Sequence, residues 1–206
     1  MRHWTDNKIE IVFVRHGKTK SNFERRYTGR NDEPLCSGGV IELLSKRRLY
    51  PKADTVFSSP MKRCLQTAEI IRPERSPIII DEWKEIDFGD FEGKTFDELK
   101  NDLRYKCWLE SGGRTPFPSG ESREEFIKRS LDGFYRAACL AKGRTMAIVH
   151  GGTIMSVLSS LCGGDYFDYQ VKNGEGYECL LHTDKNRLEL EIIGLSLIHI
   201  SEPTGL

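Results

Sequence analysis

Short apolar runs rich in β-branched residues recur along the chain and alternate with segments of helical character. Three of them, residues 9–14, 53–57 and 145–149, stop abruptly at polar residues and so predict buried strands. Alternation of strand and helix is typical of a parallel sheet covered by helices on both faces. We therefore expect an α/β protein, a three-layer α/β/α sandwich whose sheet is mostly parallel. Further strands are expected over 78–80, about 177–183 and about 187–193, with helices over 39–49, roughly 60–72, 95 to about 109, 121–142 and 153–161 and loops over 17–37 and 111–120.

The segment 121–142 is the clearest of these helices. Its apolar residues recur at steps of four and three, which draws one stripe along one side of a helix. We expect this stripe to be the buried face. The residues of the stripe are Ile127, Leu131, Phe134, Ala138 and Ala141.

Polar side chains follow three of the predicted strands. His16 comes at the end of the first strand, Ser58 and Ser59 end the second, and His150 follows the strand over 145–149. Arg63 lies one turn into the helix after Ser59. In open α/β sheets, ligands bind outside the carboxyl ends of the strands. These residues are therefore expected to meet at one edge of the sheet.

The residue types at this edge suit the chemistry of phosphate. A neutral imidazole such as that of His16 is a competent nucleophile, and the planar fork of Arg15 matches phosphoryl oxygens. Arg63 is expected near a helix N-terminus, which favours anions. Taken singly, a turn histidine or a surface arginine is the commoner explanation for each residue. Their convergence favours a site.

An acidic stretch lies between these elements, over residues 81–92. Large apolar residues alternate with its carboxylates, so full solvation is disfavoured and some of the acids are expected to be partly buried with raised pKa values. Composition alone does not choose among them. The candidates are Asp81, Glu82, Glu85, Asp87, Asp90 and Glu92.

Composition excludes several classes of function. Lysine and arginine number 31, as do aspartate and glutamate, whereas a nucleic-acid-binding protein usually shows a basic excess. No run of about 18 apolar residues occurs, so we expect no membrane span. Residues 1–8 are polar and lack the apolar segment of a signal peptide. We expect a cytoplasmic protein that binds neither nucleic acid nor membrane, and the oligomeric state stays open.

The cysteines and histidines give no metal signature. The six cysteines include no C-x-x-C pair, and several, such as Cys139 and Cys162, have apolar neighbours. We expect free, buried thiols in a reducing compartment. A metal centre of His16, His150 and acids from 81–92 is the alternative, but the neighbouring arginines would repel a cation. No metal and no cofactor are therefore expected.

Six short motifs occur in a fixed order. They are Arg15–Asn22 (R-H-G-x-T-x-x-N), Gly29–Leu35 (G-x-x-D-x-P-L), Ser58–Ala68 (S-S-P-x-x-R-x-x-Q-T-A), Glu85–Gly93 (E-x-x-F-G-x-x-E-G), Pro118–Ser122 (P-x-G-E-S) and Val149–Gly152. With them the chain resembles the histidine phosphatase superfamily over about residues 9–193, in its phosphoglycerate-mutase-like branch. The R-H-G-x-T form favours this branch over the acid phosphatases, which carry R-H-G-x-R-x-P.

The resemblance implies a role for each matched residue and a phosphoglycerate-mutase-like fold. His16 would be the nucleophile that becomes phosphohistidine. Glu85 would protonate the leaving oxygen and later activate water, so the resemblance makes the choice among the acids. The groups that would hold the phosphoryl oxygens are Arg15, Asn22, Arg63 and His150.

The resemblance predicts a metal-independent phosphomonoester hydrolase that acts on a small phosphorylated metabolite at mildly acidic to neutral pH. Within the family, the chain is similar to α-ribazole phosphatases and broad-specificity phosphatases, which makes α-ribazole 5′-phosphate a candidate substrate. The alternative is a 2,3-bisphosphoglycerate-dependent phosphoglycerate mutase, which the short segment from 86 to 149 disfavours. A non-catalytic phosphate-binding protein is disfavoured by the intact set of site residues.

We expect one domain over residues 1–194, with a cap at about 94–120 that lines the substrate pocket. The last residues, 195–206, look foreign to the domain and are set aside, although an ordinary final strand is the alternative. The cap offers basic residues that could meet a second anionic group of the substrate, although exposed surface charges are the commoner case. They are Lys94, Arg104, Lys106 and Arg114.

Overall fold

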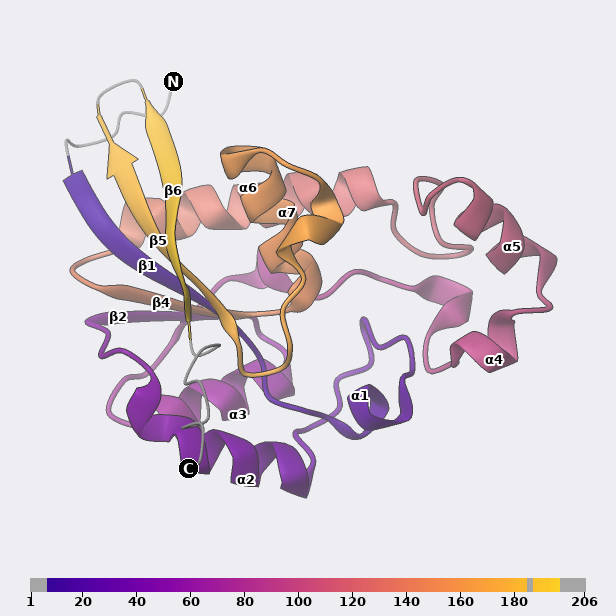
Figure 1. Cartoon of the computed structure of the whole chain (residues 1–206), viewed down its shortest axis with the longest axis horizontal. Helices are drawn as coiled ribbons and strands as arrows, with labels where there is room; N and C mark the ends of the chain where they lie inside the picture. The colour runs from indigo at the N-terminus through magenta and orange to yellow at the C-terminus, as the bar shows by residue number, and fades with distance from the viewer. Residues whose placement is uncertain (1–6, 185–186, 197–206) are drawn as a thin grey trace, which may run out of the picture.

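The computed structural model describes residues 7–184 and 187–196 and places a six-stranded sheet between two layers of helices (Figure 1). The strand order is β3-β2-β4-β1-β5-β6. The strands β3, β2, β4 and β1 pair in parallel, β5 pairs antiparallel with β1, and β6 pairs antiparallel with β5. The predicted α/β sandwich with a mostly parallel sheet is confirmed. The strands are β1 (Asn7–Arg15), β2 (Thr55–Ser58), β3 (Ile78–Ile79), β4 (Thr145–Val149), β5 (Gly176–Thr183) and β6 (Leu188–Ser196).

Side chains of β1 point alternately to the two faces of the sheet and pack into both apolar layers. Val12 and Val14 pack into the cluster that contains the buried residues of α2 and α3, and Ile11 and Phe13 pack into the cluster formed with α6 and α7. Successive side chains of a strand point to opposite faces, so a strand that is apolar at every position is buried on both. The helices are α1 (Lys20–Glu24), α2 (Ser37–Lys46), α3 (Lys62–Ile71), α4 (Phe96–Leu99), α5 (Leu103–Glu110), α6 (Arg123–Leu140) and α7 (Gly151–Cys162), with 3₁₀ turns η1 (Arg47–Leu49), η2 (Asp81–Trp83), η3 (Gly89–Phe91) and η4 (Tyr166–Tyr169).

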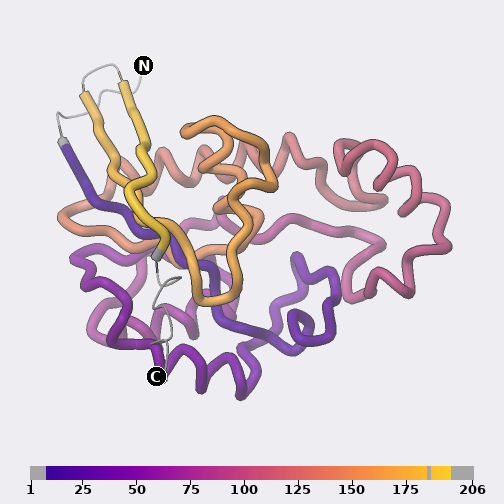
Figure 2. Tube along the Cα trace, in the orientation of Figure 1, coloured from indigo at the N-terminus to yellow at the C-terminus, as the bar shows by residue number. Residues whose placement is uncertain are grey.

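A cap projects from one end of the sheet and contains α4, α5 and the loop that leads to α6 (Figure 2). It has an apolar core of its own, which also takes in residues before and after the predicted cap boundaries of 94 and 120. Gly89 has a φ of +51°, and a Cβ there would lie 2.1 Å from the carbonyl oxygen of Pro118, so glycine is required where the two cap segments meet. The core residues are Ile86, Phe91, Leu99, Tyr105, Phe117 and Phe126.

Two predicted segments differ in local structure. The expected loop over 17–37 contains α1, whose first turn is closed by a capping box between Thr19 and Asn22. The helix expected from Thr95 to about 109 is capped by Thr95 as predicted but breaks into α4 and α5, because Asp102 caps a new helix. Side chains that bond the local backbone compete with a continuous helix, and the periodicity of apolar residues does not register them.

The buried face of α6 matches the predicted stripe at Phe134 and Ala138 but is otherwise rotated from it. Ile127 and Leu131 are only half-buried, whereas Ser130 and Gly133 are fully buried. A Cβ on Gly133 would lie 2.7 Å from Nε1 of Trp83, so the large ring of Trp83 requires a small residue there. The helix therefore packs with its small residues against a neighbouring aromatic ring.

The cysteines are free, as predicted, but only Cys64 and Cys179 are buried, and Cys139 is exposed on α6. The expectation of generally buried thiols is wrong for Cys139, since apolar neighbours in sequence lie on other faces of a helix. At the other end of the chain, Leu195 and Ser196 extend β6 by pairing with β5 beyond the predicted end at 193. The rest of the segment that was set aside, 197–206, lies outside the described residues.

Candidate active site

Three adjacent strands, β2, β4 and β1, deliver polar groups to the same edge of the sheet. The backbone N–H of His16 donates to the carbonyl of Val149 (2.9 Å), and that of Ser59 donates to Ile148 (3.0 Å). The backbone hydrogen bonds of the sheet thus continue to His16 and Ser59, the residues that follow β1 and β2, and hold them in place. The imidazole rings of His16 and His150 lie 5.2 Å apart, centroid to centroid. The predicted meeting of these residues is what the structure shows.

His16 is held in one tautomer by its own turn. Its Nδ1 lies 2.8 Å from the carbonyl oxygen of Gly17, which can only accept, so Nδ1 carries the proton and Nε2 is left with a free lone pair. The side chain is 3% exposed. Burial, together with the charges of Arg63 and Arg15, holds the pKa of His16 well below its usual value. A neutral ring with an unprotonated Nε2 is the form that can attack phosphorus.

His150 is oriented by Ser59. The Ser59 hydroxyl oxygen lies 2.8 Å from Nε2 of His150 and accepts the backbone N–H of Met61 at 3.4 Å, and a hydroxyl can serve Nε2 as donor or as acceptor. Nδ1 of His150 lies 3.8 Å from Oε2 of Glu85. Burial first, and the charge of Arg63 second, lower the pKa of His150 well below its usual value. His150 is thus a neutral imidazole that faces the site.

Glu85 is the carboxylate that the structure brings to the histidines. Its side chain is 13% exposed, and its Oε1 accepts the backbone N–H of Ile86 at 3.0 Å. Burial raises the pKa of Glu85, although the hydrogen bond from Ile86 and the charges of Arg63 and Arg15 oppose the rise. A Cβ at Gly152 would lie 2.7 Å from Oε1, so glycine there leaves room for the carboxyl group. The predicted partly buried acid with a raised pKa is therefore present.

Two guanidinium groups lie beside the histidines. Arg63 is 1% exposed, and its Nη1 and Nη2 donate to the carbonyls of Asn31 and Gly29, both at 2.9 Å. Nη1 of Arg15 donates to Val171 (2.7 Å), while its buried Nε has no hydrogen-bond partner in the part of the chain that the structure describes. Within the described ranges, no carboxylate lies within 4.0 Å of either group. Enclosed guanidiniums that bond only to carbonyls form a site for an anion.

Asn22 is linked to this group through a residue that sequence reasoning missed. Its Oδ1 accepts from Nδ2 of Asn173 (3.0 Å) and from the backbone N–H of Thr19 (3.2 Å). Nδ2 of Asn173 also donates to the carbonyl of His16 at 3.1 Å. Asn173 thereby joins the turn before β5 to the turn after β1. An asparagine in a polar turn gives no sequence signal of such a role.

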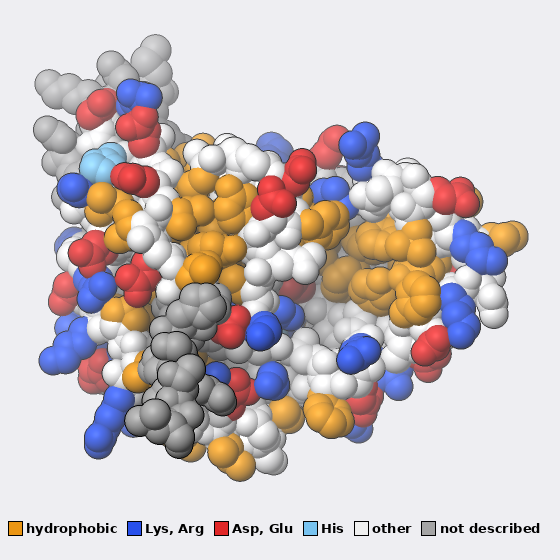
Figure 3. Space-filling view, in the orientation of Figure 1, with side chains coloured by type: hydrophobic (Ala, Val, Ile, Leu, Met, Phe, Trp, Pro, Cys, Tyr) orange, Lys and Arg blue, Asp and Glu red, His pale blue; other side chains and the backbone are white. Residues whose placement is uncertain are grey.

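A cavity of about 380 Å³ opens between this edge and the cap. Arg15 and Glu85 reach it from the site, and Trp108, Gly113 and Phe117 line it from the cap, as predicted for a substrate pocket. Hydrophobic side chains gather on the cap beside a hollow in the surface (Figure 3). The aromatic residues of the lining are Tyr27, Phe88, Trp108, Phe117, Tyr166 and Phe167.

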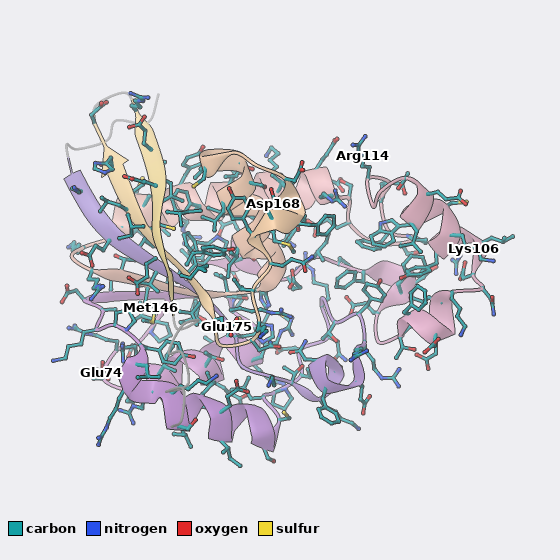
Figure 4. The ribbon with its side chains drawn as sticks, viewed as in Figure 1. Glu74, Lys106, Arg114, Met146, Asp168 and Glu175 are labelled. Atoms are coloured by element: carbon teal, nitrogen blue, oxygen red, sulfur yellow. The ribbon has the colours of Figure 1, made fainter. Side chains whose placement is uncertain are left out.

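The predicted basic residues of the cap do not line this cavity. Arg104 is paired with Asp90 (2.7 Å) and Asp102 (3.0 Å) on the surface. Figure 4 shows Lys106 and Arg114 on the outer side of the cap. The cap therefore lines the cavity with aromatic groups. The commoner case named for these residues, an exposed surface charge, holds for Arg104, Lys106 and Arg114, and Lys94 is half-buried outside the lining.

A different arginine, Arg123 at the start of α6, lies at the cavity. Its guanidinium lies 5.0 Å from the ring centroids of both Tyr166 and Phe167, and Nη2 donates to the carbonyl of Gly112 at 2.8 Å. Stacking of this kind holds an arginine side chain in place. Sequence analysis did not single out Arg123, because it lies beyond the predicted cap and resembles any first-turn residue of a surface helix.

Comparison with known proteins agrees with this geometry. The family model described as histidine phosphatase superfamily (branch 1) matches residues 11–192. The chain belongs to this superfamily. The predicted enzyme class, a histidine phosphatase, is thereby confirmed, as is the resemblance that the motifs carried. In the described ranges, no helix is long and apolar enough to cross a membrane, and no group of three or more candidate metal ligands occurs.

The relatives of this histidine phosphatase include enzymes of two kinds. A protein of Hydrogenobacter thermophilus, provisionally named phosphoserine phosphatase 2, is 33% identical over 74% of this chain and 78% of its own. Phosphoglycerate mutase-like protein 4 of Arabidopsis thaliana is 33% identical over 72% of this chain and 69% of its own. The crystal structure of the α-ribazole phosphatase from Shigella flexneri superimposes with a TM-score of 0.77 at 20% identity, covering 94% of this chain and all of that one, and shows the same fold.

Proposed function

We propose that this histidine phosphatase hydrolyses phosphomonoesters through a phosphohistidine on His16 and requires no metal. The observation that carries the proposal is a buried, neutral His16 beside two guanidiniums that have no carboxylate partner among the described residues. Nε2 of His16 attacks the phosphorus, the bond from phosphorus to the ester oxygen breaks, and Glu85 gives its proton to that oxygen. Water then attacks the phosphohistidine, gives a proton to Glu85, and releases phosphate and neutral His16.

The charges of the site match what this reaction needs. Phosphoryl transfer places negative charge on the outer oxygens, so catalysis is mostly positioning and charge stabilisation. Arg15 and Arg63 supply fixed positive charge, and His150 adds a neutral donor in the tautomer with Nδ1 protonated. We propose that Asn22 supports the same oxygens with its remaining amide N–H groups. These groups together take the place that a metal ion holds in other phosphatases.

The two pKa shifts bring the required states of the catalytic groups closer together in pH. With ordinary values, about 6.5 for histidine and about 4.3 for glutamate, glutamate would lose its proton before histidine became neutral. Burial lowers the pKa of His16 and raises that of Glu85. Both shifts favour a neutral nucleophile beside a protonated acid, which supports the proposed activity at mildly acidic to neutral pH.

The lining of the cavity supports hydrolysis of an ester with an uncharged aromatic group. Besides Arg15 and Glu85 at the site, Arg123 is the charged residue of the lining among the described residues, and its guanidinium is already stacked on two rings. α-Ribazole 5′-phosphate carries an uncharged heteroaromatic base, which suits such a wall. 3-Phosphoglycerate offers no aromatic group to this wall, and among the described residues its carboxylate would have Arg123 as the cation of the lining beyond Arg15. The aromatic residues of the lining therefore favour an aromatic ester as the substrate of a hydrolase.

The test is phosphate release from a panel of monoesters with chelator present. The panel contains an aryl phosphate, α-ribazole 5′-phosphate, phosphoserine and 3-phosphoglycerate. Chelator-resistant release that prefers the aromatic esters is expected. Loss of activity in chelator would overturn metal independence, and conversion of 3-phosphoglycerate to its isomer without phosphate release would establish the mutase. Binding of phosphate without turnover of any ester would leave the non-catalytic function. A cytoplasmic location stays a prediction.

A further inference from the structure

Arg129 uses its whole guanidinium to hold the segment that presents Glu85. The side chain lies on α6, and its Nη2 donates to the carbonyl of Glu85 at 3.0 Å. Nη1 donates to the carbonyls of Glu82 (2.7 Å) and Lys84 (2.5 Å). Nε and Nη2 contact the two carboxylate oxygens of Glu121 at 2.6 and 2.8 Å. An arginine has five N–H donors, and these five contacts give each of them an acceptor.

Glu121 holds the next part of the same segment. Its Oε2 accepts the backbone N–H of Asp87 (3.3 Å), and its own backbone N–H donates to the carbonyl of Asp87 (3.0 Å). Arg129 and Glu121 together therefore bind the backbone on both sides of Glu85, from residue 82 to residue 87. Residues 84–88 have no helix or strand of their own, so this pair replaces the ladder that fixes His16 and His150.

We infer that Arg129 is a positioning residue, which acts through the backbone of Glu85 to keep that carboxyl group aimed at the ester oxygen. The inference rests on the proposed role of Glu85 as the acid. Arg129 itself does not line the cavity, so no direct contact with substrate is involved. Misplacement of a catalytic group by about 1 Å can cost on the order of 100-fold in rate. The fork geometry is what matters, because a lysine at this position could not span the same acceptors.

The same helix provides a matched control. Arg136 lies two turns along α6 and also contacts the segment, but only through the exposed carboxylate of Glu82, at 3.2 and 3.3 Å. A surface ion pair of this kind contributes little. Loss of Arg136 therefore removes an arginine from the same helix while leaving the backbone of Glu85 held.

The experiment compares two esters that differ in their need for a general acid. A nitrophenolate leaves without protonation, whereas an alkoxide requires the proton of Glu85. We would measure kcat/KM, which reports the steps up to phosphohistidine formation, for 4-nitrophenyl phosphate and for an alkyl phosphate. The variants are Arg129→Gln, Arg129→Lys, Glu121→Gln, Arg136→Gln and, as the reference, Glu85→Gln.

The expected result is a selective loss. Arg129→Gln lowers kcat/KM about 100-fold for the alkyl ester, and less than about fivefold for the nitrophenyl ester. The kcat/KM of Arg129→Lys for the alkyl ester lies between that of Arg129→Gln and that of the wild type. Glu121→Gln shows the same selective fall in kcat/KM by a smaller factor, and Arg136→Gln has the kcat/KM of the wild type. Thermal unfolding of each variant is measured alongside, and Glu121→Gln carries the test if Arg129→Gln does not fold.

Failure of the inference can be told apart from failure of the proposed function. Suppose that Glu85→Gln lowers kcat/KM selectively for the alkyl ester, whereas Arg129→Gln lowers kcat/KM equally for both esters or for neither. Arg129 is then a structural residue and the inference is overturned. If Glu85→Gln itself loses equally on both esters, Glu85 is not the acid. The proposed function then fails in that step, and the inference fails with it.

Discussion

The sheet edge and the cap are built from different kinds of side chain. At the edge, His16 and His150 follow strands whose ladder hydrogen bonds fix them, and their side chains bond to Gly17 and Ser59. In the cap, aromatic rings contact one another; Trp108 lies 4.8 Å from Phe117, centroid to centroid. On the outer surface of the cap, Arg104 pairs with Asp90 and Asp102. The edge is thus a rigid polar site, and the cap is an apolar wall.

This difference separates reaction from substrate choice. The groups that would perform phosphoryl transfer all lie at the edge, where burial sets the pKa values of His16 and Glu85. The groups that would contact the rest of the ester lie in the cap and at η4. Variants of the edge should therefore change kcat for every substrate, and variants of the wall should change KM for particular substrates. The following predictions test that division.

Replacement of the nucleophile should have the largest effect. His16→Ala is expected to lower kcat at least about 10⁴-fold on every ester, because the covalent step is lost. The matched control is His182→Ala, since His182 lies on β5 away from the site. Two measurements test this: steady-state phosphate release, and labelling of the protein by a ³²P-ester. The stability of the label is then compared in acid and in base. Base-stable, acid-labile label in the wild type and none in the His16 variant is expected; label that persists in the variant would place the covalent step elsewhere.

The pH profile should show both shifted pKa values. As pH falls through the lowered pKa of His16, the nucleophile becomes protonated and activity is lost; as pH rises through the raised pKa of Glu85, the acid is lost. The ratio of kcat/KM for wild type and Glu85→Gln on an alkyl phosphate cancels the ionisation of the substrate. That ratio should be largest, about 10²–10⁴, at low pH and should fall about tenfold per pH unit above the pKa of Glu85. A ratio independent of pH would exclude Glu85 as the titrating acid.

The sequence predicted the edge well because strand ends are positions that a pattern can locate. A buried apolar run followed by His16 or His150 predicts both the strand and the side chain at its end. Glu85 was different, since the acids over 81–92 are equivalent in composition and only the family resemblance chose among them. The reason for that choice is tertiary: Arg129 and Glu121, which lie far along the chain, aim that one segment at the histidines.

The cap could not be predicted in the same way. Its basic residues were candidates for meeting a second anionic group of the substrate, with exposed surface charge as the commoner case, and Arg104 does pair with Asp90 and Asp102 on the surface. Apolar periodicity located Phe134 and Ala138 on the buried face of α6 but missed Ser130 and Gly133, because the close approach of Trp83 requires a small residue at Gly133. The contact of Trp83 with Gly133 joins segments distant in sequence, which periodicity does not record.

A variant of the wall should alter binding and leave the chemistry unchanged. Phe167 lines the cavity but is 54% exposed, so Phe167→Ala is not expected to unfold the protein. The loss of one aromatic contact should raise KM for an aryl phosphate about three- to tenfold with kcat unchanged. Phe23→Ala is the control, since Phe23 is 84% exposed on α1 and outside the cavity. A fall in kcat with constant KM would show that the wall takes part in the reaction step.

The smallest effect is expected from the outer charges of the cap. Arg104→Ala and Lys106→Ala should each change kcat/KM by less than about twofold on neutral and anionic esters alike, because exposed ion pairs contribute only about 0–1 kcal/mol and neither side chain lines the cavity. Kinetics with 4-nitrophenyl phosphate and 3-phosphoglycerate provide the comparison. A rise in KM confined to 3-phosphoglycerate would mean that these cations turn inward to meet a second anionic group. The contrast between a polar edge and an apolar wall would then fail, and the mutase would regain its support.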